Sequence, residues 1–223
     1  MIHRRFQKGW ETIINISDLM IGDILLCSSS SLSQKMYAAT NSCYSHAAIC
    51  IGVDFLAEAT IRGMKKNSIK DILNDYDYMA VIRLKDYWTP ERADNLINFI
   101  DDRIESKAEF NSSGLREFTI ISGEYHKNLP KNLAQFFEGN HEPISPNKDE
   151  YFCSELVVSA YIHVGIIGDS ASLLYNPKTI SPGDIAKDAT FGSFIGYIIR
   201  NNNCIISECD DFYEEIMDII LID

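Results

Sequence analysis

The pattern of apolar and polar residues predicts a sheet made of several short strands. From Tyr44 to Val53 the chain alternates, so that one face carries Ala47, Ile49, Ile51 and Val53 and the other carries Tyr44, His46, Ala48 and Cys50. Further strands are predicted for the segments "DILLC" (residues 23–27), "FLAEAT" (55–60), "YMAVIRL" (78–84) and "FGSFIGYIIR" (191–200). Because strands that follow one another closely tend to pair, the sheet is expected to be mainly antiparallel.

Helical spacing follows a different period and predicts three helices. Residues 89–106 begin with Thr89 as a cap and Pro90 in the first turn, and residues 32–41 also have helical spacing. In "YFCSELVVSAYIHVG" (residues 151–165), Cys153 lies in the first turn and Gly165 stands where a helix terminator belongs. Prolines break residues 110–150, which are interpreted as a loop-like insertion, and "TISPGDIAKD" (179–188) as a turn.

Length and charge narrow the possible classes of protein. A chain of 223 residues can bury the core of a single domain, and its formal charge of −12 disfavours nucleic acid and stable binding to anionic membranes. An acidic C-terminal extension is expected at residues 201–223, and its run "ECDDFYEEIMD" (208–218) is interpreted as a solvated helix face. Neither a signal peptide nor a transmembrane segment is readable, and the six cysteines lack a disulfide-like spacing, so a cytoplasmic protein with reduced thiols is expected.

Cys153 and His46 form the candidate catalytic pair. A thiol needs a helix N-terminus or an imidazolium to lower its pKa, and the position of Cys153 supplies the first of these. His46 is the histidine placed on a strand, among small or amphipathic neighbours that leave room for a partner. The alternative for each residue is a packed core side chain, and Cys27, Cys43 and Cys50 are interpreted as such structural thiols.

Glu58 is the candidate that would orient the imidazole, and the register of its strand decides whether it can. A two-residue turn at Val53 and Asp54 would point Glu58 to the face of Ile49, whereas a three-residue turn that includes Gly52 would give it the face of His46. Zinc is disfavoured, because Cys43 points away from His46 and Cys50 on a strand. No metal or cofactor is expected.

Five ordered segments resemble the circularly permuted NlpC-like, papain-like cysteine hydrolases of the bacterial YiiX/YebB-like group. The matching segments are "GDILL", "YSHAAICIG", "LAEAT", "YFCSELVVSAY" and "SPGDIA", which run from Gly22 to Ala186. The resemblance implies an α+β, papain-like fold in which an antiparallel sheet or partly open barrel packs against helices. The strand with the histidine then precedes the helix with the cysteine. It also implies Cys153 as nucleophile, His46 as base and Glu58 as the orienting residue.

The expected activity is hydrolysis of an amide bond in a peptide or peptidoglycan fragment. The related lecithin:retinol acyltransferases act on lipids, so an acyltransferase, lipase or amidase with a lipid substrate is the alternative, and a non-catalytic binding module is a second one. The backbone amide of Cys153 and the hydroxyl of Tyr44 are the candidate oxyanion donors. The partner is expected to be a small molecule, peptide or lipid substrate, and the oligomeric state stays open.

Overall fold

The chain folds into two compact units. The computed structural model describes residues 13–29, 41–140 and 142–213. The first unit comprises Met1–Leu56, Lys66–Asp86 and Pro182–Asp223, and the second comprises Ala57–Lys65 and Tyr87–Ser181. The single domain expected from the chain length stays a prediction.

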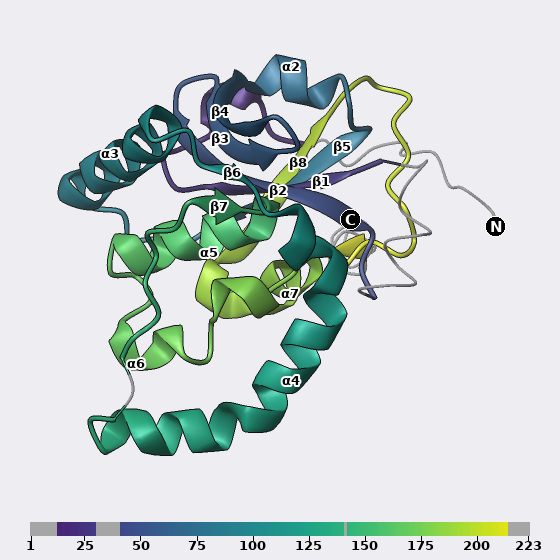
Figure 1. Cartoon of the computed structure of the whole chain (residues 1–223). Coiled ribbons are helices and arrows are strands. Elements are labelled where there is room, and N and C mark those ends of the chain that lie inside the picture. The colour runs from purple at the N-terminus through teal and green to yellow at the C-terminus, as the bar shows by residue number, and fades with distance from the viewer. Residues whose placement is uncertain (1–12, 30–40, 141, 214–223) are drawn as a thin grey trace. The chain divides into compact units, whose positions relative to one another are not determined.

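An antiparallel sheet of six strands confirms the predicted α+β class. Its strand order is β4-β3-β2-β1-β5-β8, and β1 pairs antiparallel with β2 and β5, as β5 does with β8 (Figure 1). The strands are β1 (Ile24–Ser28), β2 (Tyr44–Gly52), β3 (Phe55–Thr60), β4 (Gly63–Ser68), β5 (Tyr78–Arg83) and β8 (Ser193–Ile199). The sequence pattern missed β4, because "GMKKNS" lacks the apolar alternation of a half-buried strand.

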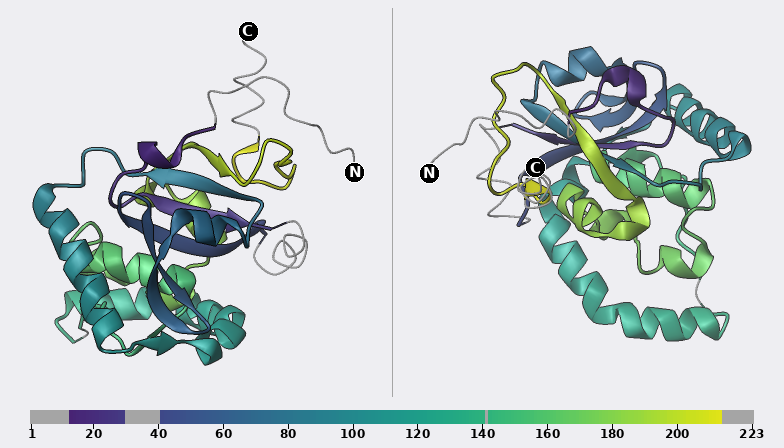
Figure 2. Two further views of the ribbon diagram at one scale, coloured as in Figure 1. Left: turned by 90° about the horizontal axis from the view of Figure 1, so that it is seen from above. Right: turned by 180° about the vertical axis from the view of Figure 1, so that it is seen from behind.

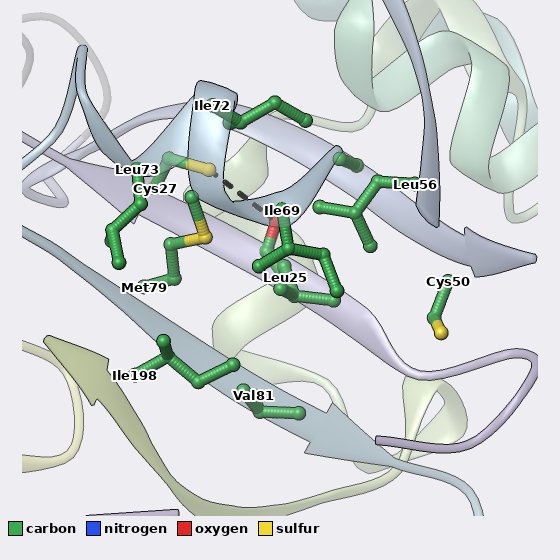
Figure 3. Close-up of a cluster of buried hydrophobic side chains, with 11 residues drawn as sticks. Leu25, Cys27, Cys50, Leu56, Ile69, Ile72, Leu73, Met79, Val81 and Ile198 are labelled. Atoms are coloured by element: carbon green, nitrogen blue, oxygen red, sulfur yellow. Dashed lines mark hydrogen bonds between the residues drawn. The ribbon is translucent and has the colours of Figure 1, made fainter. Parts of the chain in front are cut away.

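A short helix covers one face of this sheet. Helix α2 (Ile69–Leu73) is capped by Ser68, whose side chain accepts from the backbone amide of Asp71. Figure 3 shows its apolar side chains above the strands. The cluster comprises Leu25, Cys27, Ala48, Cys50, Leu56, Ile69, Ile72, Leu73, Met79, Val81 and Ile198.

A bulge in β2 corrects the predicted face of Tyr44. Cys27 pairs with His46 and Ser28 with Tyr44, with a register shift between the two pairs. Because Cys27 and Ser28 are adjacent on β1, their partners lie on opposite faces, and Ser45 is the extra residue. The expectation that Tyr44 shares the face of His46 is therefore wrong.

The turn between β2 and β3 combines features of both alternatives considered above. The strand bounds leave Val53 and Asp54 between Gly52 and Phe55. Of these turn residues only Asp54 has a positive φ, of 65°. That pattern is typical of a three-residue turn that ends in a left-handed bulge residue, whereas two-residue hairpin turns need a positive φ at their first position. Leu56 accordingly joins the cluster of Ala48 and Cys50.

The second unit is mainly helical. Its elements are α3 (Pro90–Glu105), β6 (Glu109–Phe110), α4 (Ser112–Phe137), β7 (Glu150–Tyr151), α5 (Cys153–His163), α6 (Asp169–Ser172) and η3 (Pro177–Thr179). Helix α3 confirms its predicted start, because the Thr89 side chain accepts from the amide of Arg92 and Pro90 is the first helical residue. Helix α5 begins at Cys153, and Gly165 beyond its end has a φ of 70°, as its terminator role requires.

Two sequence interpretations need correction. Residues 112–137 form the 26-residue helix α4 instead of a loop, with Pro130 inside it, and Figures 1 and 2 show the helix bending along its length. Proline removes one intrahelical hydrogen bond, and a long helix absorbs that loss as a kink instead of ending there. Residues 182–187 form α7 (Pro182–Lys187) instead of a turn. The helix predicted for residues 32–41 falls outside the described residues except at its end.

Candidate functional site

Cys153 is the first residue of a deeply buried helix. Phe152 is the N-cap, and Cys153 retains 7% of its exposure. Buried residues then continue without interruption to Tyr161, so α5 is enclosed on all sides instead of along the single stripe expected from the sequence. The amides of a first helical turn have no acceptor within the helix and carry the positive end of its dipole, which favours a thiolate at this position.

The buried carboxylate of Glu155 fixes this first turn. Its Oε2 accepts from the backbone amide of Phe152 at 3.2 Å and from Nδ2 of Asn111 at 3.1 Å. Its Oε1 lies 2.8 Å from Nζ of Lys148, whose pKa is lowered, chiefly by burial. A fully buried carboxylate with three donors holds the segments that supply them in place. This cluster is not among the sequence predictions, although a glutamate three residues after the N-cap is a recognisable helix-start signal.

Asn111 links the start of α4 to the start of α5. Its side-chain Oδ1 accepts from the backbone amide of Gly114 at 2.7 Å, and its backbone N–H donates to the carbonyl of Tyr151 at 3.1 Å. Strands β6 and β7 pair in parallel there, with Phe110 opposite Tyr151. The segment before Cys153 is thus held on both sides, and Ser154 after it donates to the carbonyl of Ile180 at 2.8 Å.

His46 lies in the first unit, at the edge of the cluster under α2. It pairs with Cys27 in the β1–β2 ladder and retains 8% exposure. Its ring stacks on Tyr76 with centroids 5.7 Å apart and an interplanar angle of 7°. Tyr76 packs against the apolar cluster, so the stacking restricts how the imidazole can rotate.

Glu58 is buried in the second unit and contacts a lysine. Its Oε1 lies 3.2 Å from Nζ of Lys65, and Glu58 is 4% exposed. Glu58 follows Leu56 by two residues on β3, so both side chains point to the same face of that strand. An ion pair with Lys65 is one role that the sequence analysis did not anticipate.

Tyr44 belongs to a buried network around Asp210. The Tyr44 and Tyr78 hydroxyls each donate to Oδ2 of Asp210 at 2.8 Å, and the Tyr197 hydroxyl donates to Oδ1 at 2.6 Å. The carboxyl is 6% exposed, and burial raises its pKa despite these donors. The interpretation of the acidic tail as a solvated face is therefore wrong at Asp210, because the buried carboxyl packs residue 210 into the first unit.

Three of the other thiols lie in environments that keep them protonated. Burial raises the pKa of Cys43 to about 12, that of Cys50 to about 11 and that of Cys204 to about 12, so these thiols are protonated near neutral pH. None of the six cysteines forms a disulfide bond. Among the residues that the structure describes, no group of three or more His, Cys, Asp or Glu side chains could hold a metal ion.

The two described histidines of the second unit are poorly suited to serve as the base. His163 ends α5, about 15 Å from Cys153 at 1.5 Å per residue, and stacks on Phe99. His126 contacts the carbonyl of Ser122 through Nδ1 at 2.7 Å. His46 and Cys153 belong to different units, so their approach stays a prediction, as does the approach of Glu58 to His46.

Comparison with known proteins gives one distant relative. No family model matches the chain. The chain is 28% identical over 190 residues to the "Probable lipoprotein peptidase YaeF" of Escherichia coli K12. The alignment covers 77% of this chain and 64% of that protein, so the chain spans less than two thirds of its relative's length. In the described part of the chain, no helix is both long and apolar enough to cross a membrane.

Gly114→Ala should disturb the start of α5 through Asn111. An added Cβ would lie 2.5 Å from Nδ2 of Asn111, the atom that donates to Glu155. Because Asn111 is buried and cannot move aside freely, we expect a loss of about 1–3 kcal/mol in the free energy of unfolding. Gly123→Ala is the matched control in the same helix, where a Cβ meets nothing within 4 Å, and it should gain about 0.5–1 kcal/mol. Urea denaturation measures both, and equal stability of the two variants would contradict the role of Asn111.

The stability of the wild-type chain should fall with rising pH relative to Asp210→Asn. The native carboxyl has a raised pKa, so between its ordinary value of 3.8 and the raised value the native state binds more protons than the unfolded state. Stability is therefore full below the ordinary pKa and is lost as pH rises through the native one. Urea unfolding from pH 4 to 8 measures the slope, and exposed Glu208→Gln should keep the wild-type slope. A wild-type slope in Asp210→Asn would show that Asp210 is not the titrating group.

Proposed function

We propose that the chain is a thiol hydrolase with a permuted papain-like fold that cleaves an amide bond of a peptide or peptidoglycan fragment. The observation that carries the proposal is the position of Cys153 at the first residue of α5, in a turn clamped by Glu155. Strand β2 with His46 precedes this helix in the chain, as the permuted order requires. The relative's name as a probable peptidase supports hydrolase chemistry.

The proposed reaction begins with proton transfer from the Cys153 thiol to His46. The thiolate attacks the amide carbonyl, and the backbone amide of Cys153 donates to the oxyanion. The imidazolium then gives its proton to the leaving amine, the C–N bond breaks and a thioester remains. Water, deprotonated by His46, attacks the thioester and releases the acid and the free thiol.

Glu58 is proposed to accept the second ring N–H of His46. The bulged turn after Gly52 and the place of Leu56 beside Ala48 and Cys50 support this face of β3. The role predicted for Tyr44 fits less well, because its hydroxyl proton is donated to Asp210 and the β2 bulge turns it to the face opposite His46. The proposed oxyanion site therefore depends on the backbone amide of Cys153.

Variants of the three proposed residues should separate their roles in peptide hydrolysis. Cys153→Ala should abolish turnover, and His46→Ala should lower kcat/KM by about 10²–10⁴-fold, because proton transfer in the transition state is lost. Glu58→Gln should lose less, since an amide oxygen still accepts the imidazole hydrogen. Mass spectrometry of incubations with muropeptides and with phospholipids measures the products.

Lys65→Gln is the control that distinguishes orientation from an ion pair. If Glu58 acts only through its contact with Lys65, the Lys65 and Glu58 variants should lose activity equally. The proposal predicts a larger loss for Glu58→Gln. Full activity in Cys153→Ala would end the hydrolase hypothesis, and lipid products without peptide products would favour the acyltransferase or lipase alternative. A chain that binds peptide without turnover would be a binding module.

A further inference from the structure

A pocket of about 530 Å³ opens in the second unit, beside strand β6. Its walls are residues 61–64 at the tip of the β3–β4 hairpin, Ile104 at the end of α3, residues 107–110 and Ser112. The backbone amide of Met64 donates to the carbonyl of Ala108 at 3.3 Å and joins the hairpin to the wall. A Cβ at Gly63 would lie 3.3 Å from the same carbonyl, so the two segments approach closely. A volume of this size holds a small ligand or a short piece of peptide.

The lining of this pocket carries two cationic side chains and one carboxylate. Arg62 and Lys107 are exposed in its lining, and Glu109 supplies the carboxylate. Within the described residues, neither cation forms a salt bridge or a side-chain hydrogen bond. A local excess of positive charge in a chain of net charge −12 favours an anionic ligand.

Lys107 occupies a backbone position that usually belongs to glycine. Its φ is 57°, and it follows α3 in a terminating turn where the amide of Ala108 donates to the carbonyl of Arg103 at 3.0 Å. A lysine in this conformation carries a strain that glycine would avoid, and such strain is often retained where a side chain has a function. The strain therefore points to the same ammonium group as the pocket does.

Apart from Ser112, the remaining side chains of the lining are apolar, and one of them lies on a strand that pairs close to Cys153. Met64 and Ala108 are buried, and Ile104 and Phe110 are partly exposed. Phe110 pairs with Tyr151, two residues before Cys153, so its Cα lies within roughly 12 Å of that of Cys153, given a strand spacing of about 4.8 Å and about 3.5 Å per residue. Three to four extended peptide residues span such a distance.

We propose that this pocket binds the carboxylate-bearing end of a peptide substrate, three or four residues from the amide bond that is cleaved. Arg62 and Lys107 pair with the carboxylate, and Met64, Ile104 and Phe110 contact the apolar side chain next to it. The assignment rests on the proposed function for its choice of a peptide. An anionic lipid headgroup offers similar charge, and the test separates the two sources.

Binding to the full chain with Cys153→Ala tests the pocket without any turnover. The probes are acetylated hexapeptides of five alanines and a terminal leucine, one with a free C-terminal carboxylate and one with an amide, measured by calorimetry. The carboxylate peptide should bind more tightly, and Arg62→Gln with Lys107→Gln should weaken it by about tenfold or more, as expected for a lost charge-assisted contact. The double variant should change the affinity of the amide peptide little. Lys131→Gln, on α4 outside the pocket, should leave the affinities of both peptides unchanged.

Lys107→Gly gives a second readout that a structural role would not produce. Removing the strained side chain should raise the thermal midpoint while it weakens binding of the carboxylate peptide. If Lys107→Gly lowered the thermal midpoint as well as the affinity, the side chain would support the structure, and a functional role for the strain would be overturned. Equal affinity for the two peptides, no effect of the double variant or no binding of either peptide would overturn the proposal. The proposal would also be overturned if phosphatidylglycerol vesicles bound through Arg62 and Lys107 while the peptides did not bind. Selective binding of the carboxylate peptide by a chain that hydrolyses no peptide would instead reject the proposed function and retain the pocket.

Discussion

The second unit depends on one buried carboxylate, that of Glu155. It accepts from the amide of the N-cap Phe152, from Asn111 before α4 and from Lys148 before β7. Removing the Lys148 ammonium would take away the cation paired with Oε1 and leave a buried charge uncompensated, which costs more than the contact itself contributes. Glu155 therefore determines where α5 begins, and with it the position of Cys153 in the first helical turn. The thiol chemistry that we propose depends on this position, because the free amides and the dipole of the first helical turn favour the thiolate.

Asp210 holds the tail in the first unit by related physics. Three tyrosine hydroxyls and the amide of Phe212 donate to its carboxyl, while burial raises its pKa. The contact with Tyr44 reaches β2 near His46, where the bulge at Ser45 separates the two side chains onto opposite faces. Tyr44 is thereby drawn toward the tail, and the stacking on Tyr76 sets the plane of the imidazole independently.

Local patterns predicted much of the fold and little of the polar scaffold. Strand β2 and helices α3 and α5 follow from alternation, capping and a terminal glycine, because each signal is contained in a few adjacent residues. Pro130 indicated a loop where the chain forms a helix, since a helix of 26 residues can absorb one proline as a bend. The bulge at Ser45, the contact of Glu155 with Asn111 and the tyrosine partners of Asp210 depend on pairings between separate segments, which residue spacing does not encode. Cys153, His46 and Glu58 could be proposed from the sequence, but the contact of Glu58 with Lys65 could not.

The pairing of Cys153 with His46 is the central claim, and the pH dependence of Cys153 alkylation tests it most directly. The measurement uses iodoacetamide and a Cys209→Ser background, because Cys209 is the exposed thiol of the described residues. Quantitative mass spectrometry follows modification of Cys153 from pH 4 to 10. If the imidazolium stabilises the thiolate, Cys153 should react well below the ordinary cysteine pKa of about 8.5, and His46→Ala should shift the profile toward that value. An ordinary cysteine profile that His46→Ala leaves unchanged would contradict the pairing.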